Sequence, residues 1–174
     1  MPQETESAAT LDGTEVALLS SAMAAVVPRD AVFRAIDRIA GARMAVNVFS
    51  ASVCFLETME LERVYSSRPD VYGVGLRKSK RETRWAQQVL VERQVFVGEG
   101  ALEMAAAFDD QERMASIGIR SIINVPVVVA DRCLGVLNFA RNVERVLPAH
   151  VVLARWLGVA AGVAFLAPTP PPRR

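Results

Sequence analysis

Two amide side chains stand in the most apolar part of this chain. Residues 118–140 read GIRSIINVPVVVADRCLGVLNFA, and Asn124 and Asn138 lie almost symmetrically about the short polar segment ADR. A buried amide must find hydrogen-bond partners, either within the protein or on a bound molecule. The chemistry offered by these two residues is therefore recognition of a polar group.

The two asparagines are expected to face one another across a β-hairpin. Both flanking runs are rich in β-branched residues, which are typical of strands. A three-residue loop, Ala130–Arg132, would pair Val129 with Cys133 and hence Asn124 with Asn138. A two-residue turn would leave the two amides out of register or on opposite faces.

This register makes both faces of the hairpin mostly apolar. The first face carries Ile123, Val125, Val127, Val129, Cys133, Gly135, Leu137 and Phe139. The second carries Ile122, Asn124, Pro126, Val128, Leu134, Val136, Asn138 and Ala140. Because the first face has no polar side chain, we expect helices to cover it as a dry core.

The second face is expected to line a polar pocket, roofed by the segment 70–118. Buried amides on an otherwise apolar surface need partners, and a bound polar molecule would supply them. The candidate ligand contacts on this face are Ile122, Asn124, Asn138 and Ala140. The alternative is that the two amides bond to each other or to nearby backbone.

Composition limits the classes of protein that need to be considered. The 174 residues are 52% apolar and 22% charged, with a formal net charge of +1, which suits one domain with a full core. A balance this near to neutral argues against nucleic acid as the main partner. Two cysteines without a CxxC motif, and an acidic N-terminus without a secretory signal, favour the cytoplasm. We expect disordered tails at 1–14 and 167–174, the second proline-rich, around a domain at 15–166.

Periodicity and capping patterns predict an α+β fold around an antiparallel sheet. Asp30 is expected to cap a helix that Gly41 closes, and the capping-box patterns at Ser79–Glu82 and Asp109–Glu112 each predict a helix start. The predicted helices are at 15–27, 30–41, from 80, 109–118 and 148–166. The predicted strands are at 45–56, 61–66 and 94–97, together with the two arms of the hairpin.

The hairpin resembles the last hairpin of a GAF domain. In RSIINVPVVVADRCLGVLNFA the resemblance lies in the serine, the apolar strand with proline, the short turn and LGVLN. The order of the flanking helices fits over roughly residues 15–166, and SSRPDVYGVGLRKSK with ETRWAQQVLVERQVFV is similar to small stand-alone bacterial GAF proteins. The resemblance implies terminal helices on one face of the sheet and a small-molecule pocket on the other.

The resemblance suggests two aromatic residues as further ligand contacts, and it allows the known activities of the family to be compared with the residues of this chain. Trp85, on a lid helix, and Tyr72 become possible pocket walls, although both are also plausible core residues. Free methionine-R-sulfoxide reductase activity is disfavoured, because the chain has no cysteine between Cys54 and Cys133. Cyclic-nucleotide binding and bilin attachment lack their signatures. The run RKSKR is either a solvated loop or a means of attracting an anionic ligand.

We therefore expect a non-enzymatic, sensory or regulatory domain that binds a small polar ligand and uses no identified cofactor. Its output is expected to pass through a homodimer or a downstream protein partner. The last helix, PAHVVLARWLGVAAGVAFLA, is expected to contribute Gly158, Gly162 and Phe165 to a dimer contact rather than to cross a membrane. The alternative is a purely structural dimerisation domain whose pocket is filled by side chains.

Overall fold

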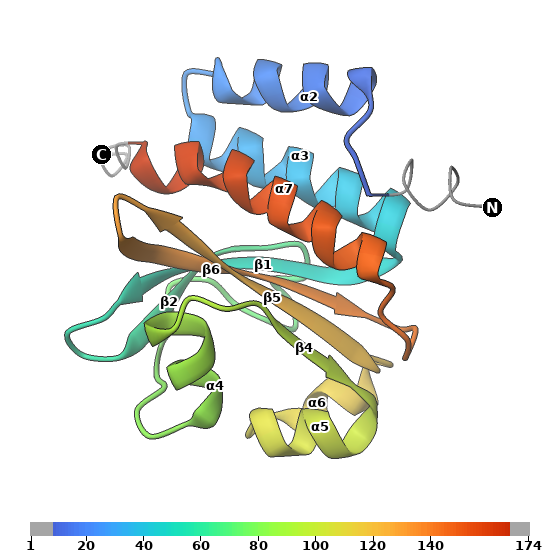
Figure 1. Ribbon diagram of the computed structural model, residues 1–174, viewed down its shortest axis with the longest axis vertical. Helices are drawn as coiled ribbons and strands as arrows, with labels where there is room; N and C mark the ends of the chain where they lie inside the picture. The colour runs from blue at the N-terminus through green and yellow to red at the C-terminus, as the bar shows by residue number, and fades with distance from the viewer. Residues whose placement is uncertain (1–8, 168–174) are drawn as a thin grey trace.

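A six-stranded antiparallel sheet forms the centre of the protein (Figure 1), whose computed structural model describes residues 9–167. The strand order is β3-β2-β1-β6-β5-β4. The strands are β1 (Val46–Phe55), β2 (Glu60–Ser66), β3 (Arg77–Ser79), β4 (Phe96–Glu99), β5 (Ser121–Val129) and β6 (Arg132–Arg141). The predicted α+β class is confirmed, and most of the two predicted tails lies outside the described residues.

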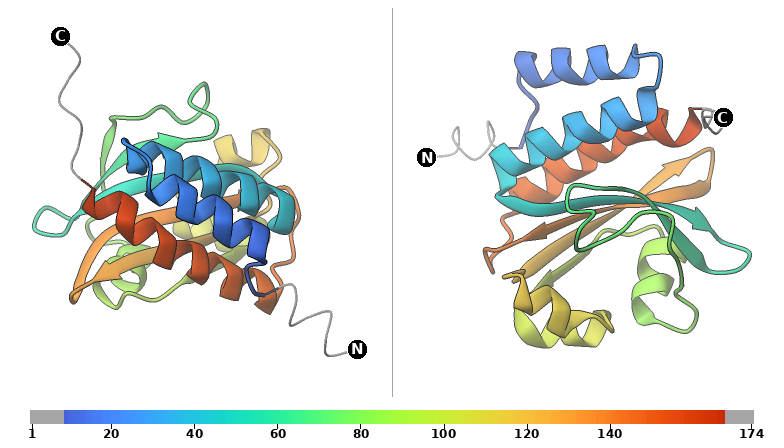
Figure 2. Two further views of the ribbon diagram at one scale, coloured as in Figure 1. Left: turned by 90° about the horizontal axis from the view of Figure 1, so that it is seen from above. Right: turned by 180° about the vertical axis from the view of Figure 1, so that it is seen from behind.

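Three helices cover one face of the sheet. They are α2 (Gly13–Met23), α3 (Pro28–Met44) and α7 (Pro148–Leu166). Figures 1 and 2 show α3 and α7 lying on the sheet and α2 lying outside them. Phe33 of α3, Phe49 of β1 and Phe139 of β6 are fully buried between these layers, with the Phe49 and Phe139 ring centroids 5.1 Å apart. The dry core expected on this face is confirmed.

The boundaries of the first two helices differ from those predicted. A capping box formed by Asp12 and Glu15 starts α2 at Gly13, and the helix ends at Met23 rather than at residue 27. Asp30 does not cap α3, which begins at Pro28, and Gly41 does not close it. The helix continues to Met44 because Met44 is buried and extends the apolar face, whereas Gly41 lies on the exposed side.

Helix α7 packs its glycines inward. A Cβ on Gly158 would lie 3.0 Å from Val125, and one on Gly162 would lie 3.6 Å from Val129. The ring of Phe165 contacts Phe33, with centroids 5.4 Å apart. The predicted exposure of these three α7 residues is therefore wrong, because they face the sheet and α3.

Helix α7 is also apolar enough, by length and composition alone, to cross a membrane, and no other helix in residues 9–167 is. Half of its most apolar window is buried inside the domain, however. Leu153, Leu157 and four alanines of α7 fill the core between α3 and β5. In this structure α7 is a core helix.

The β5–β6 hairpin pairs Asn124 with Asn138 as predicted, but it does so by a different route. The turn has two residues, Ala130 and Asp131, both with positive φ, as a type I′ turn requires. A bulge then adds Leu134 to β6, since Val127 pairs with Gly135 and Val128 with Cys133.

The bulge restores the asparagine register that a two-residue turn alone would have broken. It also turns Cys133 to the opposite face from the one predicted, where it packs with Trp85, Leu90 and Val136.

The other face of the sheet is covered by short segments. They are the helix α4 (Arg84–Ala86), the π-helical turn η1 (Gln87–Val91), α5 (Gly100–Ala107) and α6 (Gln111–Ser116). The helix predicted from residue 80 is wrong at its start. Residues 77–79 form β3, Glu82 has a positive φ of 62°, and the Thr83 hydroxyl caps α4 by accepting from Ala86 N at 3.1 Å.

The predicted cap at Asp109 is also wrong. Helix α6 begins after Asp110 and has no side-chain cap, and the preceding helix α5 was not predicted. Gly118 follows α6 with φ of +79°, as expected for a residue that ends a helix. The carboxylate of Asp110 lies instead 3.7 Å from Lys78 of β3.

Candidate ligand-binding site

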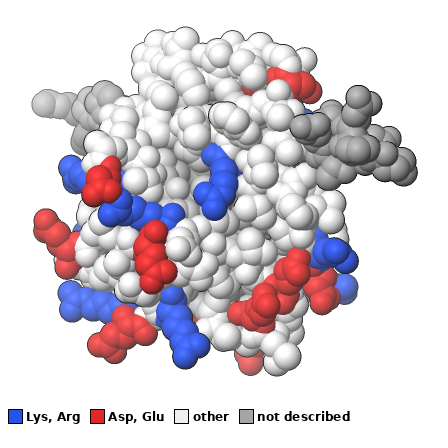
Figure 3. Space-filling view, in the orientation of Figure 1, with Lys and Arg blue, Asp and Glu red and all other residues white. Residues whose placement is uncertain are grey.

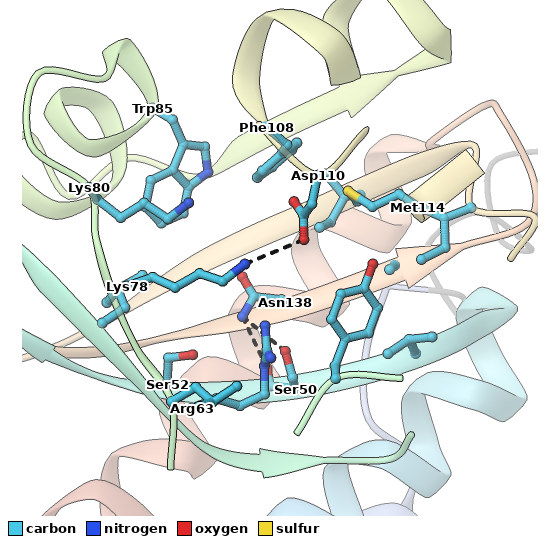
Figure 4. Close-up of a pocket in the computed structure, with 17 residues that line it drawn as sticks. Ser50, Ser52, Arg63, Lys78, Lys80, Trp85, Phe108, Asp110, Met114 and Asn138 are labelled. Carbon is cyan, nitrogen blue, oxygen red and sulfur yellow. Dashed lines mark hydrogen bonds and ion pairs between the residues drawn. The ribbon is translucent and has the colours of Figure 1, made fainter. Parts of the chain in front are cut away.

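A cavity lies between the sheet and the segments that cover its second face (Figure 4). Strands β1, β2, β5 and β6 form its floor, and the loop at 72–76, β3, α4 and residues 108–119 form its walls. Its volume is about 100 Å³, whereas one water molecule needs on the order of 10–15 Å³. The described side chains therefore leave room for a small molecule. The lining residues used below are Ser50, Ser52, Arg63, Tyr72, Lys78, Lys80, Trp85, Phe108, Asp110 and Asn138.

The two asparagines form a hydrogen-bonded ladder at the floor of the cavity. Asn124 Nδ2 donates to Asn138 Oδ1 at 2.7 Å, and Asn138 Nδ2 donates to the hydroxyl of Ser50 at 3.2 Å. Trp85 Nε1 in turn donates to Asn124 Oδ1 at 2.8 Å. The alternative that the amides bond to each other is therefore what the structure contains.

The two asparagines of this ladder differ in burial and in their contact with the cavity. Asn138 is half-buried and lines the cavity, whereas Asn124 is fully buried and does not line it. Asn124 instead connects Asn138 to Trp85 and fixes the orientation of the indole ring. The expectation that Asn124 contacts a ligand directly does not fit this placement, because Trp85 and Asn138 occupy its hydrogen-bonding atoms.

The other predicted site residues line the cavity. Ile122 and Ala140 form part of its apolar floor, and Tyr72 and Trp85 form parts of its walls. Trp85 lies beside Phe108, with ring centroids 6.4 Å apart, and Lys80 Nζ lies 5.7 Å from the Trp85 centroid. The two interpretations of Trp85, as a core residue and as a pocket wall, both hold.

Three cationic side chains face the cavity, against one carboxylate. They are Arg63, Lys78 and Lys80, and the carboxylate is that of Asp110 (Figure 4). Burial lowers the pKa of Lys80, and the nearby Asp110 partly opposes that shift. Burial also lowers the pKa of Arg63, although a guanidinium keeps its charge at neutral pH. Arg63 and Lys80 are thus held where water stabilises their charges poorly, whereas Lys78 is exposed.

Two buried polar atoms of cavity-lining residues have no hydrogen-bond partner among the described residues. They are Arg63 Nε and the Tyr72 hydroxyl. Arg63 Nη1 does donate to the carbonyl of Gly73 at 3.3 Å, and its guanidinium carbon lies 5.0 Å from the Tyr72 ring centroid. Burial raises the pKa of Tyr72, so the hydroxyl remains protonated. Each unpartnered buried group costs on the order of 1–3 kcal/mol.

Several lining residues were missed by sequence reasoning. Ser50 and Ser52 of β1 are one strand away from the asparagine hairpin, and Ser50 pairs directly with Asn138. Their i, i+2 spacing is the signal that could have found them. Lys78 and Lys80 belong to the RKSKR run that was noted, whereas Arg63 carries no local signal.

No cysteine lies among the described residues that line the cavity. Cys54 and Cys133, far apart in the sequence, are neighbours across the sheet. Their thiols share a hydrogen bond, which together with burial raises the pKa of Cys54. Residues 9–167 also contain no group of three or more His, Cys, Asp or Glu side chains that could hold a metal ion. Recognition by hydrogen bonds and charge is the chemistry that this lining offers.

No protein-family profile and no curated protein sequence matches the chain. Solved structures do match it. The GAF domain of a phosphoenolpyruvate-protein phosphotransferase from Coxiella burnetii has a TM-score of 0.69 at 14% identity, over 85% of this chain and 90% of that one. The GAF domain of a two-component sensor histidine kinase from Bacillus halodurans gives 0.65 at 14%, over 80% and 95%.

A third similar structure is the phycoerythrobilin-bound GAF domain of a cyanobacterial phytochrome, with a TM-score of 0.58 at 14% identity over 93% of this chain and 96% of that one. All three share the sheet and the placement of helices seen here over most of their length. Identities this low speak for the fold alone. This chain has the fold of a GAF domain.

Proposed function

We propose that this chain is a sensory or regulatory GAF domain that binds a small polar molecule in the cavity over the second face of the sheet. The observation that carries the proposal is the contrast in packing: side chains fill the helix-covered face, while an unfilled, partly polar cavity remains on the other. Three similar folds come from a sensor kinase, a phosphotransferase and a phytochrome, and one of them is described as ligand-bound. These likenesses support a binding role.

The direct test is native mass spectrometry of the purified protein, followed by mass analysis of whatever denaturation releases. The proposal expects a stoichiometric small molecule, or a protein that gains thermal stability when a matching compound is added. The matched variant is Ala140→Phe, which fills the cavity from its floor. Two results together would contradict the proposal: the purified wild-type protein retains no small molecule, and no added compound raises its melting temperature more than it raises that of Ala140→Phe.

We also propose that the output passes through a homodimer formed by the outer side of α7. Five apolar residues are exposed there at helical spacing: Val152, Trp156, Val159, Val163 and Leu166. Figure 3 shows few charged side chains over the upper, helical part of the molecule in that view. Contiguous apolar surface of this kind is typical of interfaces. This strip replaces the one predicted from the sequence, Gly158, Gly162 and Phe165, which faces the sheet and α3.

Sedimentation velocity tests the dimer. Val159→Glu places a charge at the centre of the strip, where the native side chain is 71% exposed, and should convert a dimer to a monomer without unfolding it. Leu102→Glu, at an 89% exposed apolar position on α5, is the matched control and should leave the dimer intact. A wild-type protein that sediments as a monomer at high concentration would refute this proposal.

A further inference from the structure

The unpartnered atoms of two cavity-lining residues, Arg63 and Tyr72, indicate what kind of group is missing. A guanidinium Nε can only donate a hydrogen bond, and a protonated phenol is a good donor. Both atoms belong to one part of the wall, because the Arg63 guanidinium lies over the Tyr72 ring. A hydrogen-bond acceptor that enters between these two side chains would give both atoms a partner.

The charge of the lining indicates that this acceptor is anionic. Three cations face the cavity, and the one carboxylate among them, Asp110, is 3.7 Å from Lys78. Arg63 and Lys80 have no ion-pair partner among the described residues. An anion beside the two desolvated cations, Arg63 and Lys80, replaces part of the solvation that burial has removed, which a neutral molecule of the same shape cannot do.

The remaining walls indicate an apolar part in the same molecule. In Figure 4, Trp85 and Phe108 lie across the cavity from Arg63, Ser50 and Ser52. The cavity thus has a hydrogen-bonding side that carries Arg63 and an aromatic side, next to which Lys80 supplies a second charge. Its volume of about 100 Å³ limits the occupant to a few non-hydrogen atoms beyond the charged group unless the covering loops move.

We propose that the cavity binds a small organic anion, a carboxylate or a phosphate monoester, whose oxygens accept hydrogen bonds from Arg63 Nε and the Tyr72 hydroxyl while its apolar part lies toward Trp85 and Phe108. This inference rests on the proposed binding function and names the chemical class of the ligand. The ligand is recognised in its anionic form, so binding weakens when the acid is protonated.

The test compares probes of equal shape and different charge. The chain has two tryptophans, Trp85 in the cavity wall and Trp156 on the exposed side of α7. In a Trp156→Phe background, fluorescence therefore reports on Trp85 alone. Butyrate and butyramide are each titrated into the protein and compared, and so are benzoate and benzamide. Phenyl phosphate is the phosphate probe, and sodium chloride is the ionic-strength control. Melting temperatures are measured with the same compounds.

At least one anion is expected to change the Trp85 emission and raise the melting temperature, while its neutral counterpart does neither. Binding by the carboxylates alone, or by phenyl phosphate alone, identifies the source of the charge, and either result supports the proposal. Tyr72→Phe and Arg63→Met should each weaken binding by roughly ten- to a hundred-fold, the loss of one charge-assisted hydrogen bond. The matched controls, Tyr65→Phe and Arg77→Met, change residues that do not line the cavity and should leave the affinity unchanged.

Three results would overturn the inference. If the acid and its amide change the Trp85 emission and the melting temperature equally, the binding function stands but the claim that the ligand is an anion is rejected. Anion binding that survives both Tyr72→Phe and Arg63→Met would place the charged group elsewhere. If no probe acts, the anion class is rejected, and a neutral molecule retained in native mass spectrometry would still support the binding function by itself.

Discussion

The two faces of the sheet are built on opposite principles, and adjacent residues of one strand show the difference. Phe49 of β1 points into the helix-covered core, where it is fully buried among other aromatic rings. Ser50, the next residue, points to the other face and accepts a hydrogen bond from Asn138. One face is stabilised by close packing, and the other holds a polar network beside a cavity. We conclude that stability and recognition are assigned to separate sides of the same strands.

The largest effect is expected on the packed face. Phe49→Ala should lower the free energy of unfolding by about 3–5 kcal/mol, because the helices cannot collapse onto the space left behind. Ser50→Ala, one residue away, removes a partner of Asn138 and should cost only about 1 kcal/mol. Urea denaturation of the two variants measures this contrast. Equal losses would contradict the assignment of the two faces.

The next effect concerns the amide ladder. Asn124→Leu removes the acceptor of Trp85 Nε1 and the donor to Asn138 Oδ1, and it should cost about 2–4 kcal/mol because the buried Trp85 and the half-buried Asn138 each lose a partner. The near-ultraviolet circular dichroism signal of tryptophan should also weaken, because the Trp85 ring no longer has a fixed orientation. A variant as stable as the wild type would mean that the ladder contributes nothing and that water replaces it.

A smaller and opposite effect separates the two tyrosines. The Tyr72 hydroxyl has no partner among the described residues, so Tyr72→Phe should leave the free protein as stable as before or up to about 1 kcal/mol more stable. Tyr65, against the helix-covered core, donates to Asp37 at 3.3 Å, so Tyr65→Phe should cost up to about 1 kcal/mol. Chemical denaturation without ligand decides the signs. A clear loss of stability for Tyr72→Phe would show that its hydroxyl is satisfied in solution.

The smallest effect is the response of Tyr65 to alkaline pH. Burial, with the nearby Asp37, raises its pKa from 10.0 to about 12. A group whose pKa is raised in the folded state contributes stability below its unfolded pKa, and this contribution is lost as the pH rises through the folded value. Wild-type stability should therefore fall more steeply between pH 10 and 12 than that of Tyr65→Phe. Parallel pH profiles for the two proteins would contradict this assignment.

The sequence was most informative where one face of an element is fully apolar. The alternation along β5 and β6 predicted that Asn124 opposes Asn138 and, except for Cys133, which residues face the helices. The route to that register could not be predicted, because a two-residue turn with Ala130 in a left-handed conformation and a bulge at Leu134 have no local signature. The capping-box patterns at Ser79 and Asp109 failed because tertiary contacts use those segments differently: residues 77–79 pair with β2, and Asp110 lies beside Lys78.

The site was predicted only in part, for a related reason. Asn138, Ile122 and Ala140 share one face of a single hairpin, so periodicity was enough to group them. Arg63 and Tyr72 come from a different strand and from a loop, and only the fold brings them together. Whether a polar side chain is unpartnered is a property of the folded protein alone, and no sequence pattern reports it.

The most direct test of the proposed anion site is a crystal structure of the protein grown with butyrate, compared with one grown with butyramide. We expect density for a carboxylate at hydrogen-bonding distance from both Arg63 Nε and the Tyr72 hydroxyl, with its chain toward Trp85, and no ordered molecule in the butyramide crystals. A cavity holding only water in both crystals, with Arg63 Nε and the Tyr72 hydroxyl satisfied by that water, would contradict it.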